Sequence, residues 1–276
     1  MSRASATTCI TRRGVFGAGL LLAGATRALA APAPSPSPAA WLDYEARLRA
    51  RLADAGGGRF DAAFAQELLS QVNDFRSGQG LGSYAWDDGL AACARAHAAD
   101  MANRNYFAHE TPEGFTHLDR TSLLTRDLCG ETAENLAWRE GQRGGSTPRQ
   151  FEQLWETSPG HRKNLLREHY TSAGYGVVKV GAAYYAAGVY ADASVRLARP
   201  LPLRVRSGAE LTPALSGASP NIERLTVTQP FQNPTWMAAA SEKMPPLEAG
   251  IWQLRPMRFA GGNRFDVLTG PLFFVA

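Results

Sequence analysis

The chain has 276 residues, of which 45% are hydrophobic and 20% are charged. This composition indicates a globular protein with a sizeable core, and the length suits one large or two modest domains. Of its 29 Lys and Arg residues, four lie in residues 1–30, which hold no acidic residue, so the remaining 25 balance the 25 Asp and Glu. A formally neutral chain gives no support to nucleic-acid binding or to attraction to acidic membranes.

The first thirty residues predict an export signal. Thr11-Arg12-Arg13-Gly14-Val15-Phe16 precedes a short apolar run, and Ala28-Leu29-Ala30 offers a small-residue cleavage site. Paired arginines at this position are typical of the twin-arginine route, and an ordinary Sec signal is the alternative. The apolar run is shorter than the ~20 residues of a membrane-spanning helix. We therefore expect a periplasmic or secreted protein, cleaved near Ala30 and without a transmembrane segment.

Helical periodicity dominates the next part of the chain. Residues 31–40 alternate Pro, Ser and Ala, which favours an extended linker. Apolar residues at helical spacing then predict helices over 41–53, from 61 to about 77, and from 87 to about 103. In the last of these, His97 shares the core-facing side with Leu90 and Met101. We expect His97 to be a core residue hydrogen-bonded to the backbone rather than a ligand.

A long loop follows over residues 104–131. It has little periodicity and contains Pro112, Gly114 and Gly130, with a short helical turn expected near 117–124. Loops of this length inside a compact domain are often functional. This one carries His109.

Two cysteines remain once residues 1–30 are removed. Cys93 lies on the Ala-rich helix and Cys129 at the end of the long loop. Because an exported protein reaches an oxidising compartment, a disulfide between them is the simplest expectation. It would stabilise the fold by ~3 kcal/mol through the reduced entropy of the unfolded chain. Two buried free thiols are the alternative.

A histidine is expected at a helix start. Thr147-Pro148 begins a helix that runs through Trp155, and Ser158 with Pro159 ends it and opens a second short helix. His161 then falls in the first turn of that helix. The positive end of the helix dipole disfavours a charged imidazole, which leaves a neutral nitrogen available as a ligand or base. A capping histidine bonded to a backbone carbonyl is the alternative.

Strand patterns take over beyond residue 170. Residues 174–180 and 183–190 are separated by Gly181 and predict a hairpin, and a strand is also expected near 83–86. Helices followed by strands indicate an α+β domain in which helices cover both faces of an antiparallel sheet. Further short strands are expected at 224–228, 250–254, 263–268 and 272–275, within a small β-rich accessory domain over 196–276.

Several segments together resemble the CAP superfamily (SCP or PR-1-like), in its bacterial extracellular branch. The matching segments occur in the family's order: Val72-Asn73-Asp74-Phe75-Arg76, Trp86-Asp87-Asp88-Gly89-Leu90, Phe107-Ala108-His109-Glu110-Thr111-Pro112, Ala133-Glu134-Asn135-Leu136-Ala137, Ser158-Pro159-Gly160-His161 and Ala173-Gly174-Tyr175-Gly176-Val177. The resemblance implies an α-β-α sandwich over residues 60–192. The domains expected are then a signal (1–30), a linker with a short helix (31–59), the CAP domain (60–192) and the accessory domain (196–276).

The resemblance also implies a site. Family members with the full pattern bring two histidines and two acids together in a central cleft, which assigns His109, Glu134 and His161 here. The position matching the second acid is near Ser158, and Glu156 lies close to it. Two imidazoles and a carboxylate suit Zn²⁺ or another divalent cation.

Three interpretations of this site remain open. The first is a binding module whose cleft takes a divalent cation, a lipid or a cell-envelope component. The second is a hydrolase of peptide or cell-wall glycan, which uses either a metal or the carboxylates of Glu134 and Glu156. In the third, the residues form a polar network that only holds the cleft together. The sequence favours the binding module over an enzyme.

Overall fold

The structure is a computed structural model of the chain. It describes residues 36–276 apart from 142–144, 209–221, 230–235, 240–245 and 263. The predicted signal over 1–30 and the start of the linker lie outside these residues. The helices are α1 (Pro38–Ala53), α2 (Ala62–Gly78), α3 (Asp88–Arg104), α4 (His117–Leu124), α5 (Pro148–Thr157) and α6 (Pro159–Leu165). The strands are β1 (Arg59–Phe60), β2 (Ala85–Trp86), β3 (Thr132–Glu140), β4 (Ser172–Val180), β5 (Ala183–Ala191), β6 (Arg204–Val205), β7 (Ile222–Thr228), β8 (Trp236–Ala239), β9 (Gly250–Phe259), β10 (Phe265–Val267) and β11 (Leu272–Val275).

The first sheet has five strands in the order β1-β4-β5-β3, with β2 paired to β4. Its centre is the hairpin of β4 and β5, in which Val180 pairs with Ala183 and Gly181 supplies the positive φ of the turn. Strand β3 runs antiparallel to β5 along its whole length and forms one edge. The expected hairpin and antiparallel sheet are confirmed.

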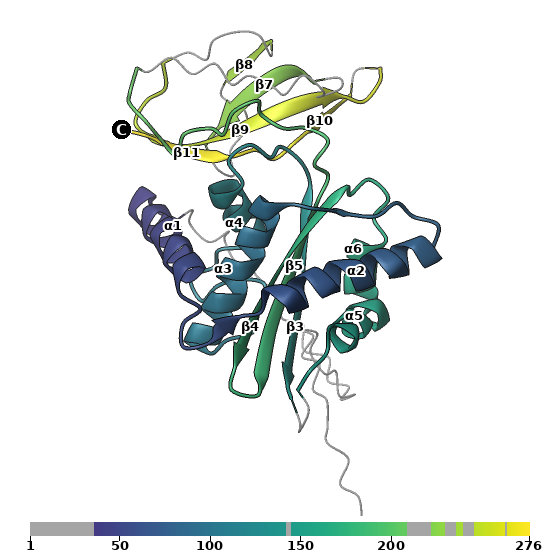
Figure 1. Cartoon of the computed structure of the whole chain (residues 1–276). Helices are drawn as coiled ribbons and strands as arrows, with labels where there is room; N and C mark the ends of the chain where they lie inside the picture. Colours follow the sequence, from purple (N-terminus) through teal and green to yellow (C-terminus); the bar gives the residue numbers. More distant parts are fainter. Residues whose placement is uncertain (1–35, 142–144, 209–221, 230–235, 240–245, 263) are drawn as a thin grey trace, which may run out of the picture.

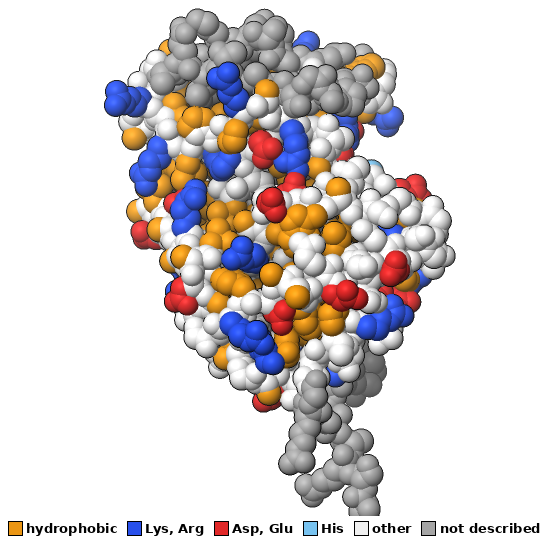
Figure 2. Space-filling model, in the orientation of Figure 1, with side chains coloured by type: hydrophobic (Ala, Val, Ile, Leu, Met, Phe, Trp, Pro, Cys, Tyr) orange, Lys and Arg blue, Asp and Glu red, His pale blue; other side chains and the backbone are white. Residues whose placement is uncertain are grey.

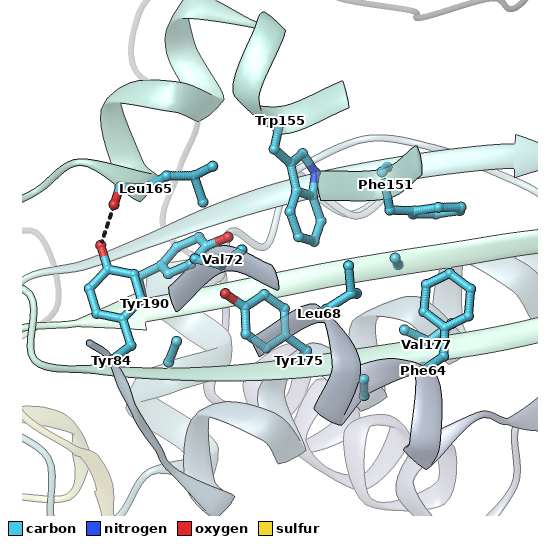
Figure 3. Close-up of a cluster of buried hydrophobic side chains, with 14 of the residues drawn as sticks. Phe64, Leu68, Val72, Tyr84, Phe151, Trp155, Leu165, Tyr175, Val177 and Tyr190 are labelled. Atoms are coloured by element: carbon cyan, nitrogen blue, oxygen red, sulfur yellow. Dashed lines mark hydrogen bonds between the residues drawn. The ribbon is translucent and has the colours of Figure 1, made fainter. Parts of the chain in front are cut away.

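Helices cover both faces of this sheet (Figure 1). On one face α2, α5 and α6 bury an aromatic-rich cluster against the strands, including Phe64, Trp155 and Tyr175 (Figure 3). At its end the hydroxyl of Tyr84 donates to the backbone oxygen of Leu165, which closes the end of α6. On the other face lies α3, flanked by α1 and α4. The predicted α-β-α sandwich is confirmed.

Helix α3 lies unusually close to β4. A Cβ atom at Gly174 would lie 2.0 Å from the backbone nitrogen of Ala91, and one at Gly176 would lie 2.2 Å from that of Arg95. Glycine on the strand and alanine on the helix therefore allow backbone to approach backbone. This contact fixes the helix that carries His97.

The second sheet has six strands in the order β6-β11-β9-β7-β8, with β10 paired to β9. It packs against α1 and α4, since Ile251, Leu272 and Phe274 share one cluster with Trp41 and Leu123. This is the expected β-rich C-terminal region. None of the helices in the described ranges is both long and apolar enough to cross a membrane.

Arg126 joins the helix layer of the first sheet to the second sheet. From the end of α4 its guanidinium donates to the backbone oxygens of Ser122, Leu201, Pro202 and Leu272. Burial lowers the pKa of Arg126 to about 10, a range in which it still carries its charge at neutral pH. The accessory sheet is thus tied to the helix layer by polar as well as apolar contacts.

Acidic and basic side chains are interspersed on the face shown in Figure 2. The charges do not gather there into a field of one sign. This distribution agrees with the balanced charge counted beyond residue 30, and it gives no electrostatic argument for a polyanionic partner on this face.

Two expectations about secondary structure need correction. Helix α1 begins at Pro38, inside the expected linker, because Ser37 accepts a hydrogen bond from the Ala40 amide and Pro38 suits the first helical position. Strand β3 was not expected. Both of its faces are covered, and Glu134 to Ala137 are all buried, so the sequence does not alternate there as a half-exposed strand would.

The expected disulfide is not present. Cys93 and Cys129 are both free and buried. Cys93 lies on the buried side of α3 and its thiol donates weakly to the Arg120 backbone oxygen, whereas Cys129 belongs to the core of the second sheet. The two thiols sit in different clusters, which corresponds to the alternative expected from the sequence.

Candidate functional site

The histidine at the helix start is placed as the sequence predicts. Thr147 caps α5 through the Gln150 amide, and Pro159 is the first residue of α6. Ser158 makes no side-chain cap bond, so the proline and the extended backbone of Ser158 define the start. His161 lies in the first turn. The side-chain amide nitrogen of Asn135 donates to the backbone oxygen of His161 at 3.2 Å. This bond ties α6 to β3.

The loop that carries His109 is braced from several sides. Asn105 ends α3 in the left-handed region, with φ of 52°. Arg104, the last residue of α3, pairs with Glu113 in the loop at 2.6 Å. The ring of Phe115 stacks on that of Tyr44 from α1, with centroids 4.1 Å apart. His109 is therefore on a fixed loop although its own side chain is 52% exposed.

Glu134 is the centre of the site. It projects from β3 with its side chain only 1% exposed, and both of its oxygens accept hydrogen bonds. Oε1 accepts from Nη2 of Arg120 at 2.7 Å and from Nδ1 of His97 at 2.9 Å, and Oε2 accepts from Nδ1 of His109 at 2.9 Å. Burial alone would raise the pKa of Glu134, but Arg120 and His97 hold it well below its usual range. The carboxylate is therefore ionised.

Arg120 supplies the counter-charge. It lies on α4 with 1% exposure and contacts the Glu134 carboxylate, the His109 backbone oxygen at 3.0 Å and the Tyr44 hydroxyl at 3.4 Å. Burial opposes its charge, but the carboxylate of Glu134 raises the pKa of Arg120 above its ordinary value. The pair is a buried, hydrogen-bonded salt bridge.

The prediction for His97 is half right. The side chain is fully buried on α3, as expected. Its partner is the carboxylate of Glu134 rather than a backbone group. Burial and the charge of Arg120 lower the pKa of His97, so its imidazole is neutral. Sequence reasoning missed both His97 and Arg120 as members of the site.

His109 and His161 form an imidazole pair. Their ring centroids are 6.2 Å apart with an angle of 56° between the planes. Burial, and then the neighbouring His109, lower the pKa of His161 to about 4. His161 is therefore neutral at physiological pH, and the causes are burial and His109 rather than the helix dipole expected from the sequence. Within the described residues, neither ring nitrogen of His161 has a hydrogen-bond partner.

Helix side chains cover the edge of β3 at this site. Three backbone oxygens of the strand each accept one hydrogen bond, from α4, α6 and α5 in turn. The three bonds are His117 Nε2 to Thr132 O at 3.2 Å, Asn164 Nδ2 to Glu134 O at 3.3 Å and Trp155 Nε1 to Leu136 O at 3.0 Å. They hold the helices bearing Arg120 and His161 against the strand bearing Glu134, and they protect the sheet edge.

A cavity of about 440 Å³ opens beside His109 and runs toward Glu131 and Arg167. Its walls carry both polar and apolar surface. The lining residues are His109, Glu110, Thr116, His117, Leu118, Glu131, Thr132, Ala133, Glu134, Asn164, Arg167 and Tyr170. At its far end Glu131 pairs with Arg167 at 2.9 Å and with His169 at 3.0 Å. Of the imidazole pair, His109 borders this space, whereas His161 is not among the lining residues.

The structure brings three of the four expected site residues together. His109 binds Glu134 and faces His161, but Glu156 does not line the cavity and instead interacts with Glu152 on the same helix. In the described parts of the chain, no three His, Cys, Asp or Glu side chains are arranged to hold a metal ion. The expected three-ligand set therefore reduces to two imidazoles, with Glu134 behind one of them.

Comparisons with known proteins agree on the central part of the chain. Residues 69–191 match the Cysteine-rich secretory protein family, CAP. These residues form a CAP domain. Over 121 residues the chain is 33% identical to the uncharacterized protein YkwD of Bacillus subtilis, which covers 44% of each chain. It is 31% identical over 112 residues to the uncharacterized membrane protein YlbC of the same organism, covering 41% of this chain and 31% of YlbC.

Among solved structures, an extracellular protein containing an SCP domain from Bacillus anthracis is similar, at 30% identity and a TM-score of 0.41. The similarity covers 48% of this chain and 41% of that one. The chain spans less than half the length of the curated relatives it matches. The family match itself is confined to residues 69–191. Helix α1 and the second sheet lie outside the family match.

Proposed function

We propose that the CAP domain is a ligand-binding module whose binding centre is the His109–His161 pair, and that a divalent transition metal such as Zn²⁺ is one ligand of this pair. The observation that carries the proposal is the neutral, unpartnered imidazole of His161 beside a second imidazole fixed by a carboxylate. Imidazole nitrogens suit Zn²⁺, and a carboxylate behind a ligating histidine is the usual outer-shell arrangement.

The side chains at the site differ in how well they suit a metal. Glu134 does not fit as a direct ligand, because both of its oxygens accept hydrogen bonds from Arg120, His97 and His109. The two histidines fit, because His109 keeps Nε2 for a ligand when Nδ1 donates to Glu134. A metal held by two protein ligands would be bound less tightly than in the four-ligand structural sites. It would supply a Lewis acid with positions open to a ligand from the cavity.

A hydrolase that uses a pair of carboxylates is not supported. Glu134 is ionised and fully hydrogen-bonded, so it has no proton to give as a general acid, and Glu156 lies outside the cavity beside Glu152. Such a mechanism needs two carboxyl groups facing one substrate. The binding interpretation relies instead on the imidazole nitrogens of His109 and His161.

The test is calorimetric titration of Zn²⁺ into metal-stripped protein. The variant His109→Ala with His161→Ala removes the pair, and His169→Ala, an exposed histidine near the far end of the cavity, is the matched control. We expect one site in the wild type and in the control, and none in the double variant. Binding that survives in a folded double variant would place the metal elsewhere and overturn the assignment.

We also propose that the protein is exported and meets its ligand outside the cytoplasm. The support is the Arg12-Arg13 pair, the apolar run behind it and the Ala28-Leu29-Ala30 site. N-terminal sequencing of exported protein should give Ala31 as the first residue. Replacing both arginines with lysine should stop export by the twin-arginine route, and unchanged export would favour the Sec route.

A further inference from the structure

We propose that His97 and Arg120 are positioning residues for the His109–His161 pair, because they fix the Glu134 carboxylate so that His109 keeps its proton on Nδ1 and leaves Nε2 for a ligand. The inference rests on the proposed function only for what binds at Nε2. The orientation of His109 itself follows from contacts in the protein, and it can be measured without any ligand.

Arg120 joins two segments that are distant in sequence. A single nitrogen, Nη2, donates to Oε1 of Glu134 at 2.7 Å and to the backbone oxygen of His109 at 3.0 Å. The first contact holds the carboxylate and the second holds the loop that must meet it. The other terminal nitrogen contacts the hydroxyl of Tyr44 on α1. A side chain outside the family match thus supports the guanidinium.

His97 decides which carboxylate oxygen is left for His109. Together with Arg120 it occupies Oε1, so Oε2 faces Nδ1 of His109 alone. An ionised carboxylate only accepts hydrogen bonds, so His109 must donate from Nδ1. In the neutral ring the unprotonated nitrogen is then Nε2. With both oxygens held, rotation of the carboxylate would break at least one of these bonds.

Packing alone does not account for a histidine at position 97. The ring is fully buried on an Ala-rich helix, and among the described residues its Nε2 has no hydrogen-bond partner. A buried polar atom without a partner is unfavourable, and an apolar side chain of similar volume would avoid it. The compensating contact is the one from Nδ1 to Glu134. The contact with the Glu134 carboxylate therefore explains why position 97 is a histidine.

The test is nitrogen-15 NMR of the imidazoles in the metal-stripped full chain, which reports the tautomer of each histidine. We expect His109 to be the Nδ1–H tautomer in the wild type and a mixture of both tautomers in His97→Leu. His97→Asn places an amide donor near the original Nδ1 and should restore the wild-type tautomer. The control is His117→Leu, since His117 lines the cavity but donates to Thr132 rather than to Glu134.

Zn²⁺ titration supplies the second measurement. Loss of an outer-shell partner lowers metal affinity by roughly 10–100-fold, so we expect about tenfold weaker binding in His97→Leu and recovery in His97→Asn. Arg120→Lys keeps the charge, but its side chain ends one atom short of Nη2 and lacks the second nitrogen that contacts Tyr44. It should therefore hold the carboxylate less well and also give mixed tautomers at His109. If His97→Leu does not fold, the tautomer of His109 in Arg120→Lys tests the proposal in its place.

Two results would overturn the proposal. One is an Nε2–H tautomer of His109 in the wild type, and the other is an unchanged His109 tautomer in folded His97→Leu or Arg120→Lys protein. Failure of the proposed function looks different. A wild type that shows the Nδ1–H tautomer but does not bind Zn²⁺ would refute the metal while leaving the positioning roles in place.

Discussion

Nη2 of Arg120 lies 2.7 Å from Oε1 of Glu134, and each of these side chains is 1% exposed. A buried ion pair of this kind contributes little to folding stability compared with apolar residues of the same volume. Removing one member is different, since the remaining charge loses its partner and stays buried. The site is therefore coupled to the stability of the domain.

The first prediction concerns this pair. Arg120→Met should lower the free energy of unfolding by about 3–5 kcal/mol, because the Glu134 carboxylate would stay buried without its counter-charge. Urea denaturation measures the loss, and Arg199→Met, at an exposed arginine, is the control. Adding Glu134→Gln to Arg120→Met should recover part of the loss. A double variant that is no more stable than Arg120→Met would show that the loss does not come from the orphaned charge.

Local signals in the sequence were enough to place α5, α6 and the hairpin. Thr147, Pro148 and Pro159 act within one helical turn, and Gly181 acts within one hairpin turn, so short windows contain the whole cause. Strand β3 could not be found this way. It is an edge strand buried on both faces, and its neighbours come from α4, α5 and α6, which are distant in sequence.

The site was predictable only in part. The family resemblance supplied His109, Glu134 and His161, and the helix-start pattern placed His161 in the first turn of α6, although its pKa is lowered by burial and His109 rather than by the dipole. His97 and Arg120 gave a weaker signal. A histidine on an apolar helix face can be satisfied by a backbone group as well as by an acid, and an arginine on a short helix does not show which acid it would pair with. The pairing with Glu134 exists only once α3, α4 and β3 are packed together.

The second prediction is the titration of His161. Burial of the neutral ring and its proximity to His109 lower the pKa to about 4, against about 6.5 for an exposed histidine. NMR titration of the metal-stripped protein should therefore show His161 uncharged down to about pH 5. Because the unfolded chain binds this proton more readily, stability should fall as the pH drops from about 6.5 toward 4. A midpoint near 6.5 would contradict the buried environment.

The third prediction concerns Glu152, a fully buried carboxylate on α5. Burial raises its pKa to about 7, although Arg149 pairs with it at 2.8 Å. The folded protein then binds a proton that the unfolded chain releases near pH 4.5, so this group's contribution to stability is lost as the pH rises from about 4.5 to 7.

Glu152→Gln should remove that loss. The melting temperature of the variant should exceed that of the wild type at pH 8 and approach it at pH 4.5. Glu67→Gln, at an exposed position of α2, is the control and should show no such pH dependence. A melting-temperature difference that is the same at both pH values would mean that Glu152 does not titrate in this range.

The fourth prediction separates thiols from a disulfide. Cys93 and Cys129 are free and buried, and burial raises the pKa of Cys129 to about 12 and that of Cys93 further. Native protein beginning at Ala31 should therefore react slowly with a thiol reagent and should titrate two thiols in denaturant without reductant. A mass two units lower, with no thiol released on unfolding, would restore the disulfide.

The last prediction concerns the contact between α3 and β4, which places His97. A Cβ atom at Gly176 would lie 2.2 Å from the Arg95 nitrogen and 2.3 Å from the Ala94 carbonyl carbon. These are backbone atoms, so Gly176→Ala must push the helix away from the strand. Overpacking of a core costs typically 1–3 kcal/mol, and we expect about 3 kcal/mol here because the helix moves as a unit.

Urea denaturation of Gly176→Ala measures this loss against Gly78→Ala. A Cβ atom at Gly78 would have no neighbour within 4 Å, and alanine is the better helix former, so that variant should be neutral or more stable by up to about 1 kcal/mol. If the helix shifts, His97 also moves relative to Glu134, and the His109 tautomer should become mixed in Gly176→Ala alone. Equal stability of the two variants would show that the helix is not held by this contact, and the position of His97 would then need another explanation.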